Sequence, residues 1–178
     1  MKINPKDILR PTLTLFIICI IAAAALSVSN LVTADKIAQN EQDKLQTAMQ
    51  QVLQADDYEQ VALENVDDDT SFYVASQGAT TVGYTALCTK TGYGGKVKVM
   101  VGIDTQGVVK KIAIVSADDE TPGLGQNIKT DEFLSRFNDI TDANSVDAWT
   151  GATISSTAVK DAVTQALELF ALYTTERN

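Results

Sequence analysis

The sequence predicts an α+β protein with one transmembrane helix near its N-terminus and a single soluble domain after that helix. Three observations lead to this prediction. An uncharged run of 24 residues lies near the start, four strand-like segments are grouped in the middle, and helix-like segments follow them. Grouped strands are typical of the α+β class, with a mainly antiparallel sheet and flanking helices. The 178 residues leave room for one domain of ordinary size beside the anchor.

Residues 11–34 form the predicted transmembrane helix. This run lies between Arg10 and Asp35 and contains no charged residue. As a helix it would extend about 36 Å, which is enough to cross a hydrocarbon core about 30 Å thick. The alternative is a cleaved signal peptide, although its apolar region usually has only about 7 to 15 residues. We favour an uncleaved anchor, and the small residues at 22–25 leave cleavage open.

Three basic residues, Lys2, Lys6 and Arg10, precede the apolar run. Basic residues beside a transmembrane helix favour the cytoplasmic side. We therefore expect residues 1–10 to be cytoplasmic and the domain after the helix to be extracytoplasmic, on a protein that crosses the cell (inner) membrane once.

Residues 35–70 are predicted to form an amphipathic helix that serves as a stalk, and the start of the soluble domain. The helical part extends to about residue 57, because Leu45, Met49, Val52 and Leu53 recur at helical spacing within a polar stretch.

Residues 71–178 make up the rest of the predicted domain. Its strands are expected at 71–75, 81–87, 96–103 and 108–115. In the third, valines and an isoleucine alternate with Lys96, Lys98 and Met100, which predicts one buried face and one wetter face. The turn at 104–107 predicts a hairpin. A short helix is expected at 131–137, and a long one has apolar residues at helical spacing: Val159, Ala162, Val163, Ala166, Leu167, Phe170 and Tyr173.

Composition excludes several classes of function. The whole chain has a net charge of −9, and the part after residue 34 carries 11 basic and 22 acidic side chains, a net charge of −11. Such a domain repels nucleic-acid phosphates, so nucleic acid is not an expected partner. The two cysteines, Cys19 and Cys88, form no metal-binding pattern, and the sequence contains no histidine. The expected chemistry therefore comes from a cofactor or from carboxylates and hydroxyls, and no metal site is predicted.

Three short segments are rich in Gly, Thr and Pro: GYGG at 92–95, ETPGLG at 120–125 and TGAT at 150–153. Each has an ordinary structural interpretation. The first suits a tight turn, the second a rigid connection from strand to helix, and the third a helix start capped by a hydroxyl. The first also lacks the Lys-Ser/Thr ending of a phosphate-binding P-loop.

Together, in this order and after one spanning helix, the three segments resemble the FMN-binding domain family. That family includes the G subunit of the Rnf complex and the C subunit of the Na⁺-translocating NADH:quinone reductase. The similarity runs from about Thr80 to the C-terminal helix, and the length of this chain is nearer that of the Rnf subunits. One departure is Asp118, which stands where the family often has a histidine.

The resemblance implies a covalent cofactor. In the family, FMN is joined through its phosphate to the last Thr of the motif, and an acidic residue stands three positions before the motif begins. Thr153 and Asp147 occupy these positions here. The long helix that follows presents N–H groups and a positive dipole end, which suit an anionic phosphate. Thr150, Gly151 and Ala152 complete the expected attachment site, with little side-chain bulk at Gly151 and Ala152.

The resemblance also implies how the isoalloxazine ring is bound. Leu124, flanked by Gly123 and Gly125, is expected to lie against the ring, and Glu120 and Thr121 are expected to offer polar atoms to its edge.

A membrane-bound electron-transfer function follows from the resemblance. The chain is expected to be the FMN-carrying subunit of an Rnf-type ferredoxin:NAD⁺ oxidoreductase, which is coupled to Na⁺ or H⁺ translocation. Its partners would be the other integral-membrane Rnf subunits, and a flavin transferase would install the FMN. Two alternatives are an extracytoplasmic FMN-binding sensor outside such a complex and a cofactor-free, membrane-anchored assembly protein. The sequence leaves open the coupling ion, the flavin potential, and the electron donor and acceptor.

Overall fold

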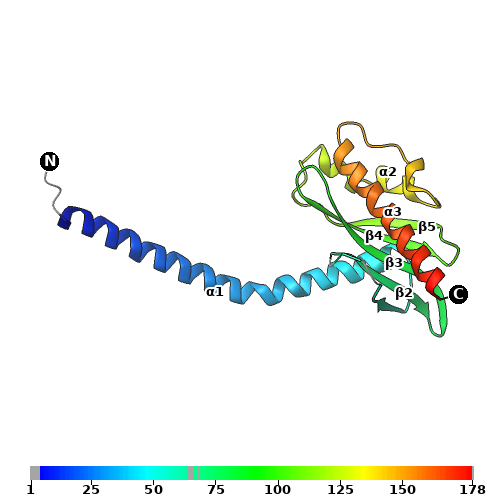
Figure 1. Ribbon diagram of the computed structural model, residues 1–178, viewed down its shortest axis with the longest axis horizontal. Helices are drawn as coiled ribbons and strands as arrows, with labels where there is room; N and C mark the ends of the chain where they lie inside the picture. The colour runs from blue at the N-terminus through cyan, green and yellow to red at the C-terminus, as the bar shows by residue number, and fades with distance from the viewer. Residues whose placement is uncertain (1–4, 64–65, 68, 178) are drawn as a thin grey trace. The chain divides into compact units, whose positions relative to one another are not determined.

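The computed structural model describes residues 5–63, 66, 67 and 69–177 (Figure 1). The chain divides into two compact units, Met1–Asp43 and Lys44–Asn178. The second unit contains the sheet, the C-terminal helix and the candidate site.

The first unit is helical. Helix α1 spans Pro5–Val52, and its stretch Pro11–Asn30 has a mean hydropathy of 2.4, with none of its side chains buried. Of the helices in the described part of the chain, α1 alone is long and apolar enough to cross a membrane, by length and composition. The predicted N-terminal apolar helix is confirmed.

The second unit is built on one antiparallel sheet of five strands, in the order β1-β2-β3-β4-β5. Four strands lie where the sequence predicts them, and β1 was not predicted. Strand β1 has the sequence DYEQV, which lacks the alternation of apolar residues that predicts a half-buried strand. It is mostly exposed and pairs with β2 alone. The strands are β1 (Asp57–Val61), β2 (Ser71–Gln77), β3 (Thr80–Thr91), β4 (Lys96–Asp104) and β5 (Val109–Ser116).

The predicted hairpin between β4 and β5 is confirmed. The Asp104 carboxylate accepts hydrogen bonds from the backbone N–H groups of Gln106 and Val108, at 2.8 and 3.0 Å. Gly107 adopts a φ of +86°, which a residue with a side chain rarely adopts. The turn chemistry of this segment is therefore what aligns β5 with β4.

Helix α3 (Thr153–Glu176) covers one face of the sheet and confirms the predicted long helix (Figure 1). Its buried residues pack against the buried side chains of β3 and β4. The far end of this core is aromatic: Phe72 stacks on Tyr84 at 5.7 Å between ring centroids, and Tyr173 lies 5.5 Å from Phe72. The apolar stripe of the sequence is thus the surface that joins helix to sheet.

The last turns of α1 cover the other face of the sheet. Met49 and Val52 are buried there with Met100, which is fully enclosed. The predicted amphipathic helix is confirmed in its spacing, but it ends at Val52 and not near residue 57. The expectation that Met100 lies on the wetter face is wrong, because the end of α1 shields that face.

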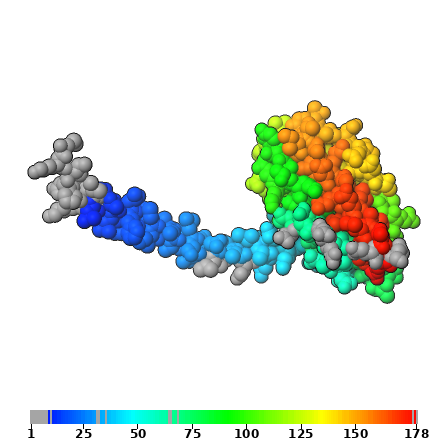
Figure 2. All heavy atoms as spheres, in the orientation of Figure 1, coloured from blue at the N-terminus to red at the C-terminus, as the bar shows by residue number. Residues whose placement is uncertain are grey.

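A long connection joins β5 to α3. It contains three short 3₁₀ helices, η1 (Gly125–Lys129), η2 (Ser135–Phe137) and η3 (Ala143–Ser145), and the short helix α2 (Asp131–Leu134). The predicted helix at 131–137 corresponds to α2 and η2, which bury Phe133 and Phe137. Figure 2 shows the turn between β3 and β4 (green) beside the first turns of α3 (orange). The three glycine-rich segments therefore meet at one end of the unit.

Candidate functional site

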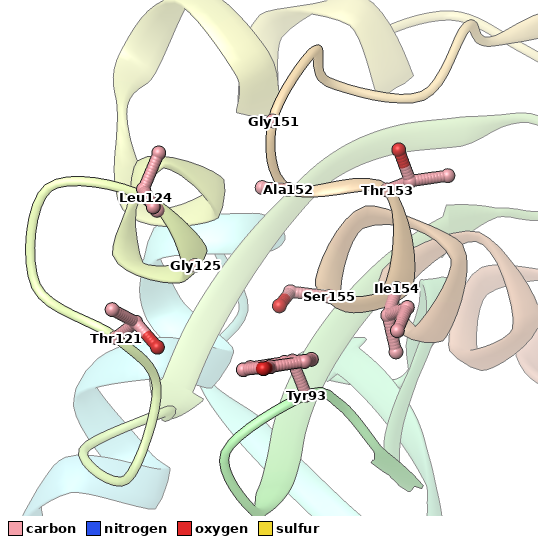
Figure 3. Close-up of a pocket in the computed structure, with 9 residues that line it drawn as sticks. All are labelled: Tyr93, Thr121, Leu124, Gly125, Gly151, Ala152, Thr153, Ile154 and Ser155. Atoms are coloured by element: carbon pink, nitrogen blue, oxygen red, sulfur yellow. The ribbon is translucent and has the colours of Figure 1, made fainter.

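A cleft of about 520 Å³ lies where the three glycine-rich segments meet (Figure 3). Thr121 and Leu124 lie on one side of the cleft, Thr153 and Ile154 on the other, and Ser155 lies between them. The three segments come from the β3–β4 turn, the loop after β5 and the start of α3. The cleft is lined by Tyr93, Thr121, Leu124, Gly125, Gly151, Ala152, Thr153, Ile154 and Ser155.

Three large apolar or aromatic side chains at this cleft are exposed. The exposed fractions are 72% for Tyr93, 53% for Leu124 and 55% for Ile154. Each comes from a different one of the three segments. A concave site with apolar walls and a few polar groups is the usual form of a binding site for a small organic ligand. The size and the walls of this cleft suit a planar aromatic ring.

Thr153 is distinguished from the other hydroxyl residues around the start of α3. Ser155 and Ser156 are buried, with 1% and 0% exposed, and their hydroxyls form hydrogen bonds inside the protein. Thr150 and Thr157 are exposed, but neither lines the cleft. Thr153 is both exposed and part of the lining. Among these hydroxyl residues, Thr153 is therefore the one that is open to solvent and also lies at the cleft.

The start of α3 is open to an anion. Its N-cap residue is Ala152, whose methyl group accepts no hydrogen bond, so the alternative interpretation of this segment as a helix start capped by a hydroxyl is wrong. Gly151 precedes it with a φ of +84°, a conformation that favours glycine. The first N–H groups of a helix and its positive dipole end attract negative groups such as phosphate. The bare segment Gly151–Ala152 leaves this end of α3 accessible.

Ser156 shapes the turn that leads into α3. Its hydroxyl donates to the Ala152 carbonyl at 2.8 Å and accepts the backbone N–H of Trp149 at 3.1 Å. Trp149 packs edge-on against Phe133 at 6.0 Å between ring centroids, and the Arg136 guanidinium lies 4.8 Å from the Trp149 ring. The exposed turn at 147–151 is therefore fixed at its base by buried groups.

Glu120 lies behind the cleft. It is 1% exposed, its Oε2 accepts a hydrogen bond from the Ser155 hydroxyl at 2.6 Å, and its Oε1 accepts one from the Gly94 N–H at 3.3 Å. A Cβ atom added to Gly92 or Gly125 would overlap this carboxylate. Glycine is needed at both positions because the carboxylate approaches the backbone so closely.

The structure brings together most of the residues predicted to form the site. Six of them line the cleft: Thr121, Leu124, Gly125, Gly151, Ala152 and Thr153. Glu120 is enclosed behind the lining, and Gly123 and Thr150 are exposed outside it.

Sequence reasoning missed three lining residues, Tyr93, Ile154 and Ser155. Tyr93 stands inside the GYGG segment, so its place in a predicted turn was the available signal. Ile154 and Ser155 directly follow the TGAT segment, in the first turn of the predicted helix. A side chain in that turn lies beside any ligand bound at the start of the helix.

Asp118, which stands where a histidine is common in the family, is an exposed acid paired with Lys129. Its Oδ1 lies 3.0 Å from the Lys129 Nζ, and the hydrogen bond and charge of Lys129 hold the pKa of the Asp118 carboxyl below its usual value. Asp118 therefore remains an anion near neutral pH and does not exchange protons there as a histidine would.

Comparison with known proteins gives matches over nearly the whole chain. A family model for the FMN-binding domain matches residues 92–168, and a model for the RnfG N-terminal region matches residues 1–52. The G subunit of the proton-translocating ferredoxin:NAD⁺ oxidoreductase complex of Clostridium ljungdahlii is 32% identical, over 92% of this chain and 89% of its own length. The G subunit of the Na⁺-translocating complex of Acetobacterium woodii is 30% identical, over 96% of this chain and 95% of its own length.

The chain belongs to the family of G subunits of ion-translocating oxidoreductase complexes. A third member, from Methanosarcina acetivorans, is 32% identical over 93% of this chain and 95% of its own length. The resemblance inferred from the three motifs is therefore confirmed. The match to the FMN-binding domain begins at Gly92 and ends at Glu168, so it contains all three segments of the cleft.

Proposed function

We propose that this chain is the electron-transfer subunit of a membrane-bound, ion-translocating ferredoxin:NAD⁺ oxidoreductase, with FMN joined through its phosphate to the Thr153 hydroxyl. Membership of the G-subunit family supports the first part, because the relatives from C. ljungdahlii and A. woodii are named as subunits of such complexes. Those two names specify H⁺ and Na⁺ respectively. Similarity to these proteins therefore supports membership of such a complex but does not identify the coupling ion. The partners are then the other membrane subunits of the complex.

The observation that carries the attachment site is the position of Thr153. Among the hydroxyl residues around the start of α3, it is the one that is exposed and also lines the cleft. A phosphate on the Thr153 Oγ would be held at the start of α3, whose positive dipole end stabilises negative charge. A free FMN phosphate carries a charge of about −1.5 to −2, and the ester with Thr153 would carry about −1. The smaller negative charge suits an acidic domain.

The cleft residues supply the binding and orientation of the ring. Tyr93, Leu124 and Ile154 provide exposed apolar surface on three segments, and Thr121 adds a polar hydroxyl. FMN, when bound, supplies the capacity to accept and release one or two electrons. The protein's part is to fix the ring's position, exclude water from one side of it and set the local charge.

Maturation by a flavin transferase, which would transfer FMN from FAD to the Thr153 hydroxyl and release AMP, is consistent with the exposure of the attachment segment. Asp147, Thr150, Gly151 and Thr153 are all exposed, so an enzyme can reach the acceptor hydroxyl and the acid that precedes it. Gly151 has no side chain to obstruct that approach.

The decisive experiment is to express the full chain with a flavin transferase and to follow flavin fluorescence on a denaturing gel. We expect a fluorescent band for the wild type, none for Thr153→Ala, and a band of wild-type intensity for Thr157→Ala. Thr157 is the matched control, since it is an exposed Thr one helical turn further along α3 but outside the cleft lining. A fluorescent Thr153→Ala band would contradict the proposal.

We further propose that α1 spans the membrane at residues 11–30 and that the FMN domain is extracytoplasmic. The basic residues Lys2, Lys6 and Arg10 precede the apolar stretch and favour a cytoplasmic N-terminus. Protease added outside intact spheroplasts should therefore digest the domain. Protection in intact spheroplasts, with digestion only after lysis, would reverse this orientation.

A further inference from the structure

Glu120 is the one buried acidic or basic side chain in the part of the chain that the structure describes. None of the four ion pairs found among the described residues includes Glu120. Burying a carboxylate costs free energy unless hydrogen bonds compensate for the lost water. A neutral side chain at this position would avoid the cost. A carboxylate at this position offers two oxygens that both accept hydrogen bonds.

Both oxygens are used, and their partners lie far apart in the sequence. The Ser155 hydroxyl donates to Oε2, and the Gly94 N–H donates to Oε1. Ser155 is 35 positions and Gly94 is 26 positions from Glu120. Gly125, from the same loop as Glu120, also lies against the carboxylate, since an added Cβ there would overlap Oε2. The Glu120 side chain thus contacts the GYGG turn, its own ETPGLG loop and the first turn of α3, which directly follows TGAT.

The three contacts stand directly beside the three apolar walls. Tyr93 precedes Gly94, Leu124 precedes Gly125, and Ile154 precedes Ser155. Each wall residue is therefore the immediate neighbour of a residue that contacts the Glu120 carboxylate. The wall side chains themselves are more than half exposed, so their own packing contributes little to holding them in place.

We propose that Glu120 is a positioning residue, which joins the three segments of the cleft through its carboxylate and so fixes the orientation of the flavin ring. This inference rests on the proposed function, because it assigns to Glu120 the support of the flavin that Thr153 carries. Glu120 acts from behind the lining, through Ser155 and the Gly94 backbone.

Two variants separate the parts of this role. Glu120→Ala removes both acceptors. Glu120→Gln keeps the size of the side chain but removes its charge, and the Ser155 hydroxyl must then accept from the amide nitrogen instead of donating to an oxygen. The matched control is Asp119→Asn, which makes the same change of charge at the neighbouring, exposed position.

The test uses the full flavin-bearing chain in detergent micelles. Flavin fluorescence anisotropy and visible circular dichroism report the fixation of the ring. We expect a large loss of both in Glu120→Ala, a smaller loss in Glu120→Gln and none in Asp119→Asn. The flavin midpoint potential should rise in Glu120→Gln, because a buried negative charge near the cleft is removed, and by less in Asp119→Asn, where water screens the charge.

Two results would overturn the role of Glu120. One is wild-type anisotropy and dichroism in a folded Glu120→Ala chain, which has neither acceptor oxygen. Where that variant fails to fold, the flavin potential of Glu120→Gln, which keeps the side-chain size, carries the test. The other is an equal shift of the potential in Glu120→Gln and Asp119→Asn. Failure of the proposed function itself gives a different result, because the wild-type chain would then lack a fluorescent band on the denaturing gel.

Discussion

The two ends of α3 are made of different kinds of side chain. Near its last turns, Tyr173 packs with Phe72 and Tyr84 in a closed aromatic cluster. At its first turn, Thr153 and Ile154 are exposed and the neighbouring segments are rich in glycine. Apolar burial at one end stabilises the helix on the sheet, and this leaves the other end free to remain open. The difference shows how one helix provides both the core and the cleft.

The largest expected effect on stability comes from breaking the closed end. Phe72→Ala should lower the free energy of unfolding by about 3–5 kcal/mol, because Phe72 is 2% exposed and its ring packs on Tyr84 and Tyr173. Urea unfolding followed by the fluorescence of Trp149, the single tryptophan, measures this change. Covalent flavin should still be found on the folded variant.

Tyr93→Ala is the matched truncation at the open end. Tyr93 is 72% exposed, so the free energy of unfolding should change by no more than about 0.5 kcal/mol. Equal destabilisation by Tyr93→Ala and Phe72→Ala would show that the cleft is part of the core, and the contrast between the two ends would be lost.

An intermediate effect is expected where the open end is fixed. Ser156→Ala should cost about 1–3 kcal/mol, because the Trp149 N–H loses its acceptor and the Ala152 carbonyl loses a donor. Attachment of flavin to Thr153 should also fall, since the turn before it is less well fixed. Thr157→Ala, at the next and exposed position, should leave both quantities within the error of the unfolding and gel measurements. Wild-type stability and flavin content in Ser156→Ala would remove Ser156 from this account.

A pH-dependent effect concerns Cys88, which lies in the core beneath α3. Burial raises the pKa of its thiol from 9.0 to about 12. The folded chain therefore binds this proton more tightly than the unfolded chain, and the corresponding stability is present below pH 9 and lost as the pH rises from 9 to 12. The loss is at most about 1.4 kcal/mol for each pH unit.

Thiol labelling checks this prediction in a Cys19→Ala background, which leaves Cys88 as the single thiol. At about pH 8 the folded chain should resist a disulfide reagent that labels the urea-unfolded chain rapidly, because the thiolate is the reactive form. Rapid labelling of the folded chain would contradict this prediction, because it would mean that the core around Cys88 opens easily.

Local patterns predicted much of the fold. The alternation of valines, the turn at 104–107 and the apolar spacing near the C-terminus each depend on residues close together in the sequence. The strand, the hairpin and the helix that they predicted are confirmed. Strand β1 is mostly exposed and has no alternation of apolar residues that would predict a strand. Its backbone pairing with β2, which the sequence does not reveal, makes it a strand. Met100 was assigned to the wetter face because nothing near it in the sequence indicates the end of α1, which covers it.

The site was predictable only where local sequence patterns indicate it. The segments GYGG, ETPGLG and TGAT are recognisable as short motifs, and they do meet at one cleft. The environment of Glu120 was not predictable, since its partners Gly94 and Ser155 come from distant parts of the chain. Its burial follows from the packing of three segments and not from any property of its own segment.

The most direct test of the central claim is to locate the flavin on a peptide of the full chain by tandem mass spectrometry. The wild-type protein should yield one modified peptide, whose fragments place FMN less one water on Thr153. The same mass on Thr150, Ser155 or Thr157, or its absence from every peptide that contains Thr153, would contradict the assignment of the cleft as a covalent FMN site.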